Sequence, residues 1–153
     1  MGDPSRVRDA TRADLPRLVE LLQQMSLDGP REELADPLPE RYYRAFAAIE
    51  ADPRQRLLVV EVDGRLVGTA TLVIVPNLSY GGRPHAIVDN VVVDETERSK
   101  GYGEALVRRC LEVAREAGCT RLALTTDMRR HDAHRFYERL GFRHSHRGYR
   151  FTF

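Results

Sequence analysis

The sequence has no tryptophan, only two cysteines, and a single lysine among its 24 basic residues. Cys110 falls on the apolar face of an expected helix and Cys119 lies just beyond its end, which is not the spacing of a disulfide framework. No apolar run approaches the ~20 residues that a membrane-spanning helix needs. The first 14 residues are polar and include acids, which excludes a signal or transit peptide. These absences favour a cytoplasmic protein without a membrane anchor.

Charge of one sign is also lacking, since the formal net charge of the 153 residues is +1. This balance disfavours a nucleic-acid partner. The charge is uneven along the chain: residues 1–64 carry nine basic and 13 acidic side chains, and residues 121–153 carry eight and three. The acidic residues of the first segment would suit a cationic substrate, and the basic residues of the last segment would suit a phosphorylated one. The alternative is that the two segments only form solvated faces of opposite charge. The length predicts one domain over residues 1–153.

Apolar spacing and turn residues predict a mixed order of strands and helices. The Asp63-Gly64 pair predicts a tight hairpin, and the nearly apolar segment 85–93 predicts a strand buried on both faces at the centre of a sheet. A helix after it predicts a parallel strand pair. The fold class is therefore α/β, a mixed and mostly antiparallel central sheet with a parallel βαβ core, flanked by helices. The expected strands are 6–10, 56–62, 66–75, 85–93, 121–126, 142–146 and 149–153, and the expected helices are 15–25, 40–50, 104–117 and 132–140.

The segment R-S-K-G-Y-G, residues 98–103, joins the central strand to a helix that is expected to begin near Glu104. We call it the glycine turn. Gly101 and Gly103 permit positive φ, so that backbone N–H groups can converge at the start of the helix. A helix N-terminus with free amides binds phosphate or pyrophosphate. The P-loop motif is absent, and Leu106 occupies the third glycine position of the dinucleotide motif.

In these motifs the chain resembles the GCN5-related N-acetyltransferases, which bind acetyl-coenzyme A. The resemblance rests on V-D-N-V-V-V-D at 88–94, the glycine turn, and A-H-R-F-Y-E-R-L-G-F at 133–142. The segment V-R-D-A-T-R-A-D-L-P-R-L at 7–18 resembles the first strand and helix of that family. The resemblance to this family implies the acyl-CoA N-acyltransferase fold with acetyl-CoA as co-substrate. No resident metal is expected. His131, His134, His144 and His146 lack the spacing of known zinc motifs.

The resemblance also implies which residues hold coenzyme A. The pyrophosphate is expected on the turn amides, and the pantetheine arm on the main chain of the central strand. Arg130 stands where family members often have asparagine, and Arg130 or His134 is expected to contact the cofactor in its place. The implied set is Val91, Val92, Val93, Arg98, Ser99, Lys100, Gly101, Tyr102, Gly103, Glu104, Arg130 and His134.

Two side chains are candidates for the chemistry of acetyl transfer to an amine. Asp89, the acid inside the apolar strand, is expected to be buried with a raised pKa and to act as a base through a water molecule. Its alternative role is a hydrogen bond to a nearby loop. Tyr137 is expected to protonate the leaving thiolate, and its alternative role is core packing beside Phe136.

The sequence therefore predicts an N-acetyltransferase that acts on a primary amine, a small molecule rather than a protein, by direct attack in a ternary complex. The alternative is a coenzyme A-binding sensor domain without catalysis. An amine pocket is expected from acids of the front loop together with residues 77–83 and Asp89; these acids are Asp28, Glu32, Glu33 and Asp36. The sequence leaves the oligomeric state open between a monomer and a homodimer, which is common in the family.

Overall fold

The computed structural model describes residues 5–153, which fall into two compact units. Unit 1 runs to Ala123 and unit 2 comprises Leu124–Phe153. The single domain over 1–153 stays a prediction. Among residues 5–153, none of the helices combines the length and apolar composition that a membrane crossing requires. The elements of unit 1 are β1 (Ser5–Asp9), η1 (Arg12–Asp14), α1 (Leu15–Gln23), α2 (Glu40–Ala51), β2 (Gln55–Val62), β3 (Arg65–Val75), α3 (Ser79–Gly82), β4 (His85–Val93), η2 (Glu95–Glu97), α4 (Tyr102–Glu116) and β5 (Leu122–Ala123).

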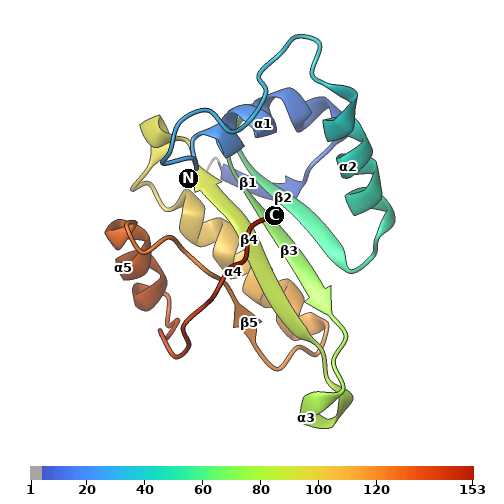
Figure 1. The fold of residues 1–153 in the computed structure, drawn as a ribbon, viewed down its shortest axis with the longest axis vertical. Coiled ribbons are helices and arrows are strands. Elements are labelled where there is room, and N and C mark those ends of the chain that lie inside the picture. The colour runs from blue at the N-terminus through green and yellow to red at the C-terminus, as the bar shows by residue number, and fades with distance from the viewer. Residues whose placement is uncertain (1–4) are drawn as a thin grey trace. The chain divides into compact units, whose positions relative to one another are not determined.

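Unit 1 is built on a five-stranded sheet in the order β1-β2-β3-β4-β5 (Figure 1). Every neighbouring pair is antiparallel except β4 and β5, which are parallel across the α4 connection. The β2–β3 turn is made by Asp63 and Gly64 at φ values of 50° and 77°, as expected for a two-residue hairpin turn in which both residues need positive φ. The predicted fold class is confirmed.

Helices pack on the sheet of unit 1 through apolar stripes. Leu18 and Val19 of α1 and Phe46 of α2 form one buried cluster with Val59 of β2. The buried stripe of α4 packs against β3, where a Cβ on Gly68 would lie 3.2 Å from Leu106 Cδ1 and 2.9 Å from Val60 Cγ1. The absence of a side chain at Gly68 therefore lets α4 approach the sheet closely.

A β-bulge interrupts β4. Val92 pairs with Thr69 and Asp89 pairs with Thr71, so Asn90 and Val91 lie opposite the single residue Ala70. Asn90 adopts a positive φ of 53°. The parallel pairing of β4 with β5 involves Ala86 and Ile87 and stops before the bulge.

The prediction that the central strand is buried on both faces is wrong. Ala86 and Val88 are buried, but Ile87 is 39% exposed and Asp89 is exposed. The reason is that α1 and α2 pack mainly on β2 and β3 and cover this face of β4 only in part.

Unit 2 contains α5 (His131–Arg139), which ends at Gly141 with φ 95°. The two predicted terminal strands, 142–146 and 149–153, are wrong, because the structure has no strand in residues 142–153. Alternating aromatic residues gave the strand pattern, yet Tyr149, Phe151 and Phe153 are exposed and no ladder forms. The predicted strand 121–126 is reduced to β5.

Candidate functional site

The glycine turn leads into α4 with backbone amides that have no acceptor inside the helix. Gly101 is the N-cap residue, with φ 89° and no side chain to cap the helix. The first intrahelical bond in α4 runs from the Ala105 N–H to the Gly101 carbonyl at 3.0 Å. The N–H groups of Tyr102, Gly103 and Glu104 therefore point out of the helix start, where the helix dipole favours an anion. Gly103 itself lies inside α4, so the expected positive φ at this residue is not found.

Cationic side chains border the glycine turn. Lys100 Nζ lies 2.6 Å from Glu97 Oε2, and this hydrogen bond raises the pKa of Lys100. Arg98 Nε donates to the Val93 carbonyl at 3.3 Å, and Arg65 lies 3.3 Å from Glu97. Lys100 thus carries its charge at neutral pH. Lys100 and Arg98 are part of the glycine turn, so both cations lie beside its backbone amides.

The bulge leaves one edge of β4 open before the glycine turn. Within residues 5–123, the ladder with β5 stops at Ile87, and no other strand pairs with that side of Val91–Val93. An open strand edge accepts an extended amide-containing chain by strand addition. On this edge the Val93 carbonyl already accepts Arg98 Nε, so that side chain would have to move for Val93 to pair through its carbonyl. The open edge and the open helix start are separated in the chain only by η2 and the glycine turn.

Asp89 lies on the face of the sheet that α1 and α2 cover in part, because directly opposed residues of antiparallel strands point to the same side and its partner is Thr71. One carboxylate oxygen accepts the Asn90 N–H at 2.9 Å. The side chain is exposed, so the burial that was predicted for it is wrong. It is open to water, as a base that acts through a water molecule requires.

A network that the sequence did not reveal ties α1 to η2, the turn that precedes the glycine turn. Arg17 of α1 forms an ion pair with Asp94, a residue that is only 6% exposed. The Asp94 carboxylate also accepts the Thr96 N–H at 2.9 Å and the Thr96 hydroxyl at 2.8 Å. These bonds, with the Arg17 guanidinium, lower the pKa of Asp94 to about 2. Gln24 adds a second link by accepting the Glu95 N–H at 2.9 Å.

The remaining candidates lie in unit 2. The Tyr137 ring packs edge to face with Phe136 and Phe142, at centroid distances of 5.0 and 5.6 Å. His134 Nε2 lies 2.9 Å from the Asp127 carbonyl, and Arg130 is the N-cap residue of α5. Thus the turn residues, the Val91–Val93 segment and Asp89 belong to unit 1, whereas these three candidates belong to unit 2.

The expected acidic amine pocket is wrong. Glu33 is paired with Arg41, and Glu32 accepts the Tyr42 hydroxyl at 3.0 Å. The loop that carries these acids and the β3–β4 loop lie at opposite ends of unit 1 (Figure 1). Carboxylates of the front loop therefore do not converge with residues 77–83.

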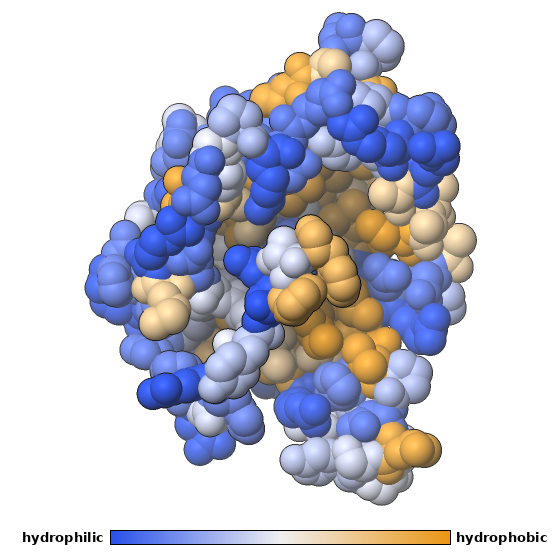
Figure 2. Space-filling view, in the orientation of Figure 1, coloured by the Kyte–Doolittle hydropathy of each residue, from blue (hydrophilic) through white to orange (hydrophobic). Residues whose placement is uncertain are grey.

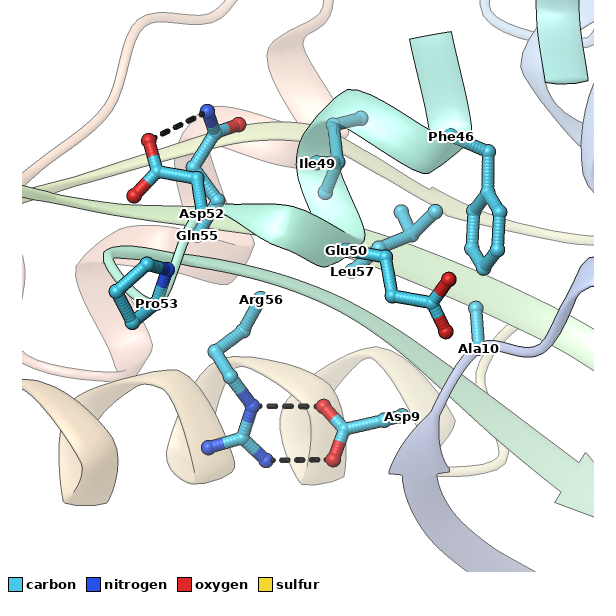
Figure 3. A pocket seen from close by; sticks show the side chains of 10 residues that line it. All are labelled: Asp9, Ala10, Phe46, Ile49, Glu50, Asp52, Pro53, Gln55, Arg56 and Leu57. Atoms are coloured by element: carbon cyan, nitrogen blue, oxygen red, sulfur yellow. Dashed lines mark hydrogen bonds and ion pairs between the residues drawn. The ribbon is translucent and has the colours of Figure 1, made fainter. Parts of the chain in front are cut away.

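Two cavities of unit 1 bear on the site. The larger, about 260 Å³, lies at the start of β2, where Arg56 binds Asp9 through two hydrogen bonds of 2.6 and 3.0 Å (Figure 3). The smaller, about 120 Å³, lies between α1, α2 and the sheet and includes Thr71 and Asn90 in its lining. Figure 2 shows apolar side chains gathered in a hollow beside α2, with hydrophilic ones around it. Only the smaller cavity adjoins the part of β4 that carries Asp89.

A mixed sheet with a bulged strand, a glycine turn and an open helix start defines the class of N-acyltransferases that the sequence motifs predict. Residues 17–142 match the model of the Acetyltransferase (GNAT) family. The chain therefore belongs to the GNAT family, whose members use acetyl-CoA. The resemblance inferred from the glycine turn and the F-Y segment is confirmed, as is the expected enzyme class of N-acetyltransferase.

Relatives and solved structures agree with this assignment. The chain is 37% identical over 99 residues to glucosamine 6-phosphate N-acetyltransferase of Trypanosoma brucei brucei, a match that covers 61% of this chain and 65% of that protein. It is 34% identical over 122 residues to aminoalkylphosphonate N-acetyltransferase of Salmonella typhimurium, covering 79% and 77%. The crystal structure of a protein described as a transcriptional regulator from Bacillus halodurans C-125 superimposes with a TM-score of 0.93 at 38% identity, covering 97% and 99%.

Proposed function

We propose that the protein transfers the acetyl group of acetyl-CoA to the primary amine of a small molecule by direct attack in a ternary complex. The observation that carries this proposal is the pair of open backbone segments on either side of η2, namely the unpaired edge of β4 at Val91–Val93 and the uncapped start of α4 at Gly101. The related enzymes named above are N-acetyltransferases for a sugar phosphate and aminoalkylphosphonates, which supports a small acceptor. We also propose a cytoplasmic location and a homodimer.

The cofactor is proposed to bind through backbone groups. The main chain of Val91–Val93 would pair with the pantetheine amides, and the amides of residues 98–104 would hold the pyrophosphate. Arg98 and Lys100 add positive charge beside these amides. Arg130 and His134 are proposed to contact the cofactor in place of the asparagine that family members often have.

The proposed step forms one bond and breaks one. The neutral amine nitrogen attacks the acetyl carbonyl, a C–N bond forms, and the C–S bond breaks to release the coenzyme A thiolate. Before the attack, the ammonium form of the acceptor gives a proton through water to Asp89. After the C–N bond has formed, the nitrogen loses its second proton to water, and Tyr137 gives a proton to the thiolate. The Val92 or Val93 amide polarises the carbonyl oxygen during the attack.

Replacement of Gly101 by alanine tests cofactor binding. Alanine at φ 89° costs about 1–2 kcal/mol of backbone strain and disturbs the amides that are proposed to hold the pyrophosphate. We expect coenzyme A to bind about tenfold more weakly, a loss of about 1.4 kcal/mol, as measured by isothermal titration calorimetry. Gly64→Ala is the matched control, since Gly64 also has positive φ and open space but lies in the β2–β3 turn. Equal weakening in both variants would contradict the assignment of the glycine turn.

Replacement of Asp89 by asparagine tests the base. With a saturating alkylamine at pH 7, we expect the rate of thiol release to fall about a hundredfold, the lower end of what a general base contributes. An alkylamine has a pKa near 10, so a growing fraction of it is already neutral as the pH rises from 7 to 9.5, and the deficit should shrink. A deficit that is constant from pH 7 to 9.5 would exclude the proposed role. Coenzyme A binding without turnover of any amine by the wild-type protein would instead indicate a sensor domain.

A further inference from the structure

The smaller cavity of unit 1 has an apolar interior. Its lining includes Leu18 and Val19 of α1, which are 2% and 1% exposed, together with Phe46 and Ile49 of α2. Its volume is about 120 Å³. A cavity of roughly 150 Å³ lined by apolar side chains accepts benzene, and roughly 30 Å³ accommodates one water-sized group. About four methylene-sized groups therefore fit in this cavity.

The polar part of the same cavity lies at β4. Thr71 and Asn90 contribute to the lining, and they are the cross-strand partner and the chain neighbour of Asp89. Since opposed residues share a face of the sheet, the Asp89 carboxylate is on the cavity side. An amine held near Asp89 would thus have an apolar cavity within reach of its substituent.

We propose that this cavity is the acceptor pocket and that the acceptor is a primary amine with a short unbranched alkyl group of about four carbons, a size set by the cavity volume. This inference rests on the proposed function and names its substrate class. The nitrogen lies toward Asp89 and the alkyl group enters between α1 and α2.

The lining argues against an anionic acceptor in this cavity. It contains no arginine, lysine or histidine, and an anion buried without a cation or a set of donors is strongly disfavoured. The cavity therefore does not suit the phosphate or phosphonate group that the names of the two related enzymes indicate for their substrates. Apolar contact is the interaction that the pocket offers.

A series of n-alkylamines from methylamine to hexylamine, assayed with acetyl-CoA by thiol release, tests the pocket. The basicity of these amines is nearly constant, so differences in kcat/KM along the series report contact between the protein and the alkyl group. Each buried methylene is expected to raise kcat/KM about fourfold until the cavity is filled near four carbons. Ile49→Val removes one methylene group from the wall and should move the optimum to a longer amine.

Ala45→Leu and Ala48→Leu form a matched pair on α2. Both residues are exposed, but Ala45 contributes to the lining and Ala48 does not. Ala45→Leu should abolish the gain with chain length and Ala48→Leu should leave it intact. The same loss in both variants, or a wild-type kcat/KM that is independent of chain length, would overturn the pocket assignment while acetyl transfer itself stands.

Binding of butylamine and ethylamine, measured by ligand-detected NMR without acetyl-CoA, separates this inference from the proposed function. Tighter binding of butylamine that is lost in Ala45→Leu supports the pocket even if no amine is acetylated, an outcome that would overturn the proposed function alone. Absence of both chain-length-dependent binding and turnover would overturn both.

Discussion

Replacing Tyr137 by phenylalanine is expected to lower kcat about a thousandfold, within the range that a general acid contributes. The substitution removes only the hydroxyl group. Its ring contacts with Phe136 and Phe142 are made by the aromatic face and edge, so the packing of α5 is retained. The measurement is steady-state thiol release with acetyl-CoA and an alkylamine, alongside thermal unfolding to confirm that stability is unchanged.

The matched control for this prediction is Tyr149→Phe, the same chemical change at a side chain that is 94% exposed. We expect wild-type kcat from this variant. If Tyr137→Phe keeps wild-type kcat with unchanged stability, the tyrosine serves only in packing. A more acidic leaving group in place of coenzyme A should partly rescue Tyr137→Phe, because a weakly basic thiolate needs little protonation.

The second large effect is expected in stability, from Asp94→Asn. The pKa of Asp94 is about 2, below the ordinary 3.8, so the folded state favours the ionised form. This group contributes stability that is fully present above about pH 4 and is lost as the pH falls through 2. At pH 7 we expect the variant to lose about 2–3 kcal/mol of the free energy of unfolding, in a urea titration. The difference from the wild type should narrow steadily as the pH is lowered from about 4 toward 2.

Asp52→Asn is a suitable comparison, because Asp52 also has a pKa of about 2 but is held by a surface contact with Arg54. Water and salt screen such a surface pair, so Asp52→Asn should lower the free energy of unfolding much less than Asp94→Asn does. The double variant Arg17→Met/Asp94→Asn should lose less stability than the sum of the single variants, since no unpaired buried charge remains. Additive losses would show that Arg17 and Asp94 do not interact.

The parts of the fold that local chemistry determines were predictable from the sequence. The Asp63-Gly64 hairpin, the apolar stripe of α4 and the start of α1, which has Pro16 in its first turn, follow from turn geometry, helical spacing and the fixed φ of proline. The glycine turn was predictable for the same reason. Gly101 adopts the left-handed conformation at the beginning of a helix, a position where glycine is tolerated best.

Features that depend on distant partners were not predictable. Arg17 and Asp94 are 77 residues apart, and nothing in either local segment indicates the other. The exposure of Asp89 depends on how much of β4 the helices α1 and α2 cover, which the apolar run of the strand does not reveal. The pattern of residues 149–153 is typical of a strand, but a strand forms only where a neighbour supplies the hydrogen bonds.

Helix α1 takes part in both proposed binding regions of unit 1. Leu18 and Val19 line the cavity, while Arg17 and Gln24 hold η2 ahead of the glycine turn. A ligand that restricts the motion of α1 from one side reduces the ordering cost for a ligand on the other side. Thermodynamic reciprocity then requires that amine and coenzyme A raise each other's affinity by the same factor, whichever binds first.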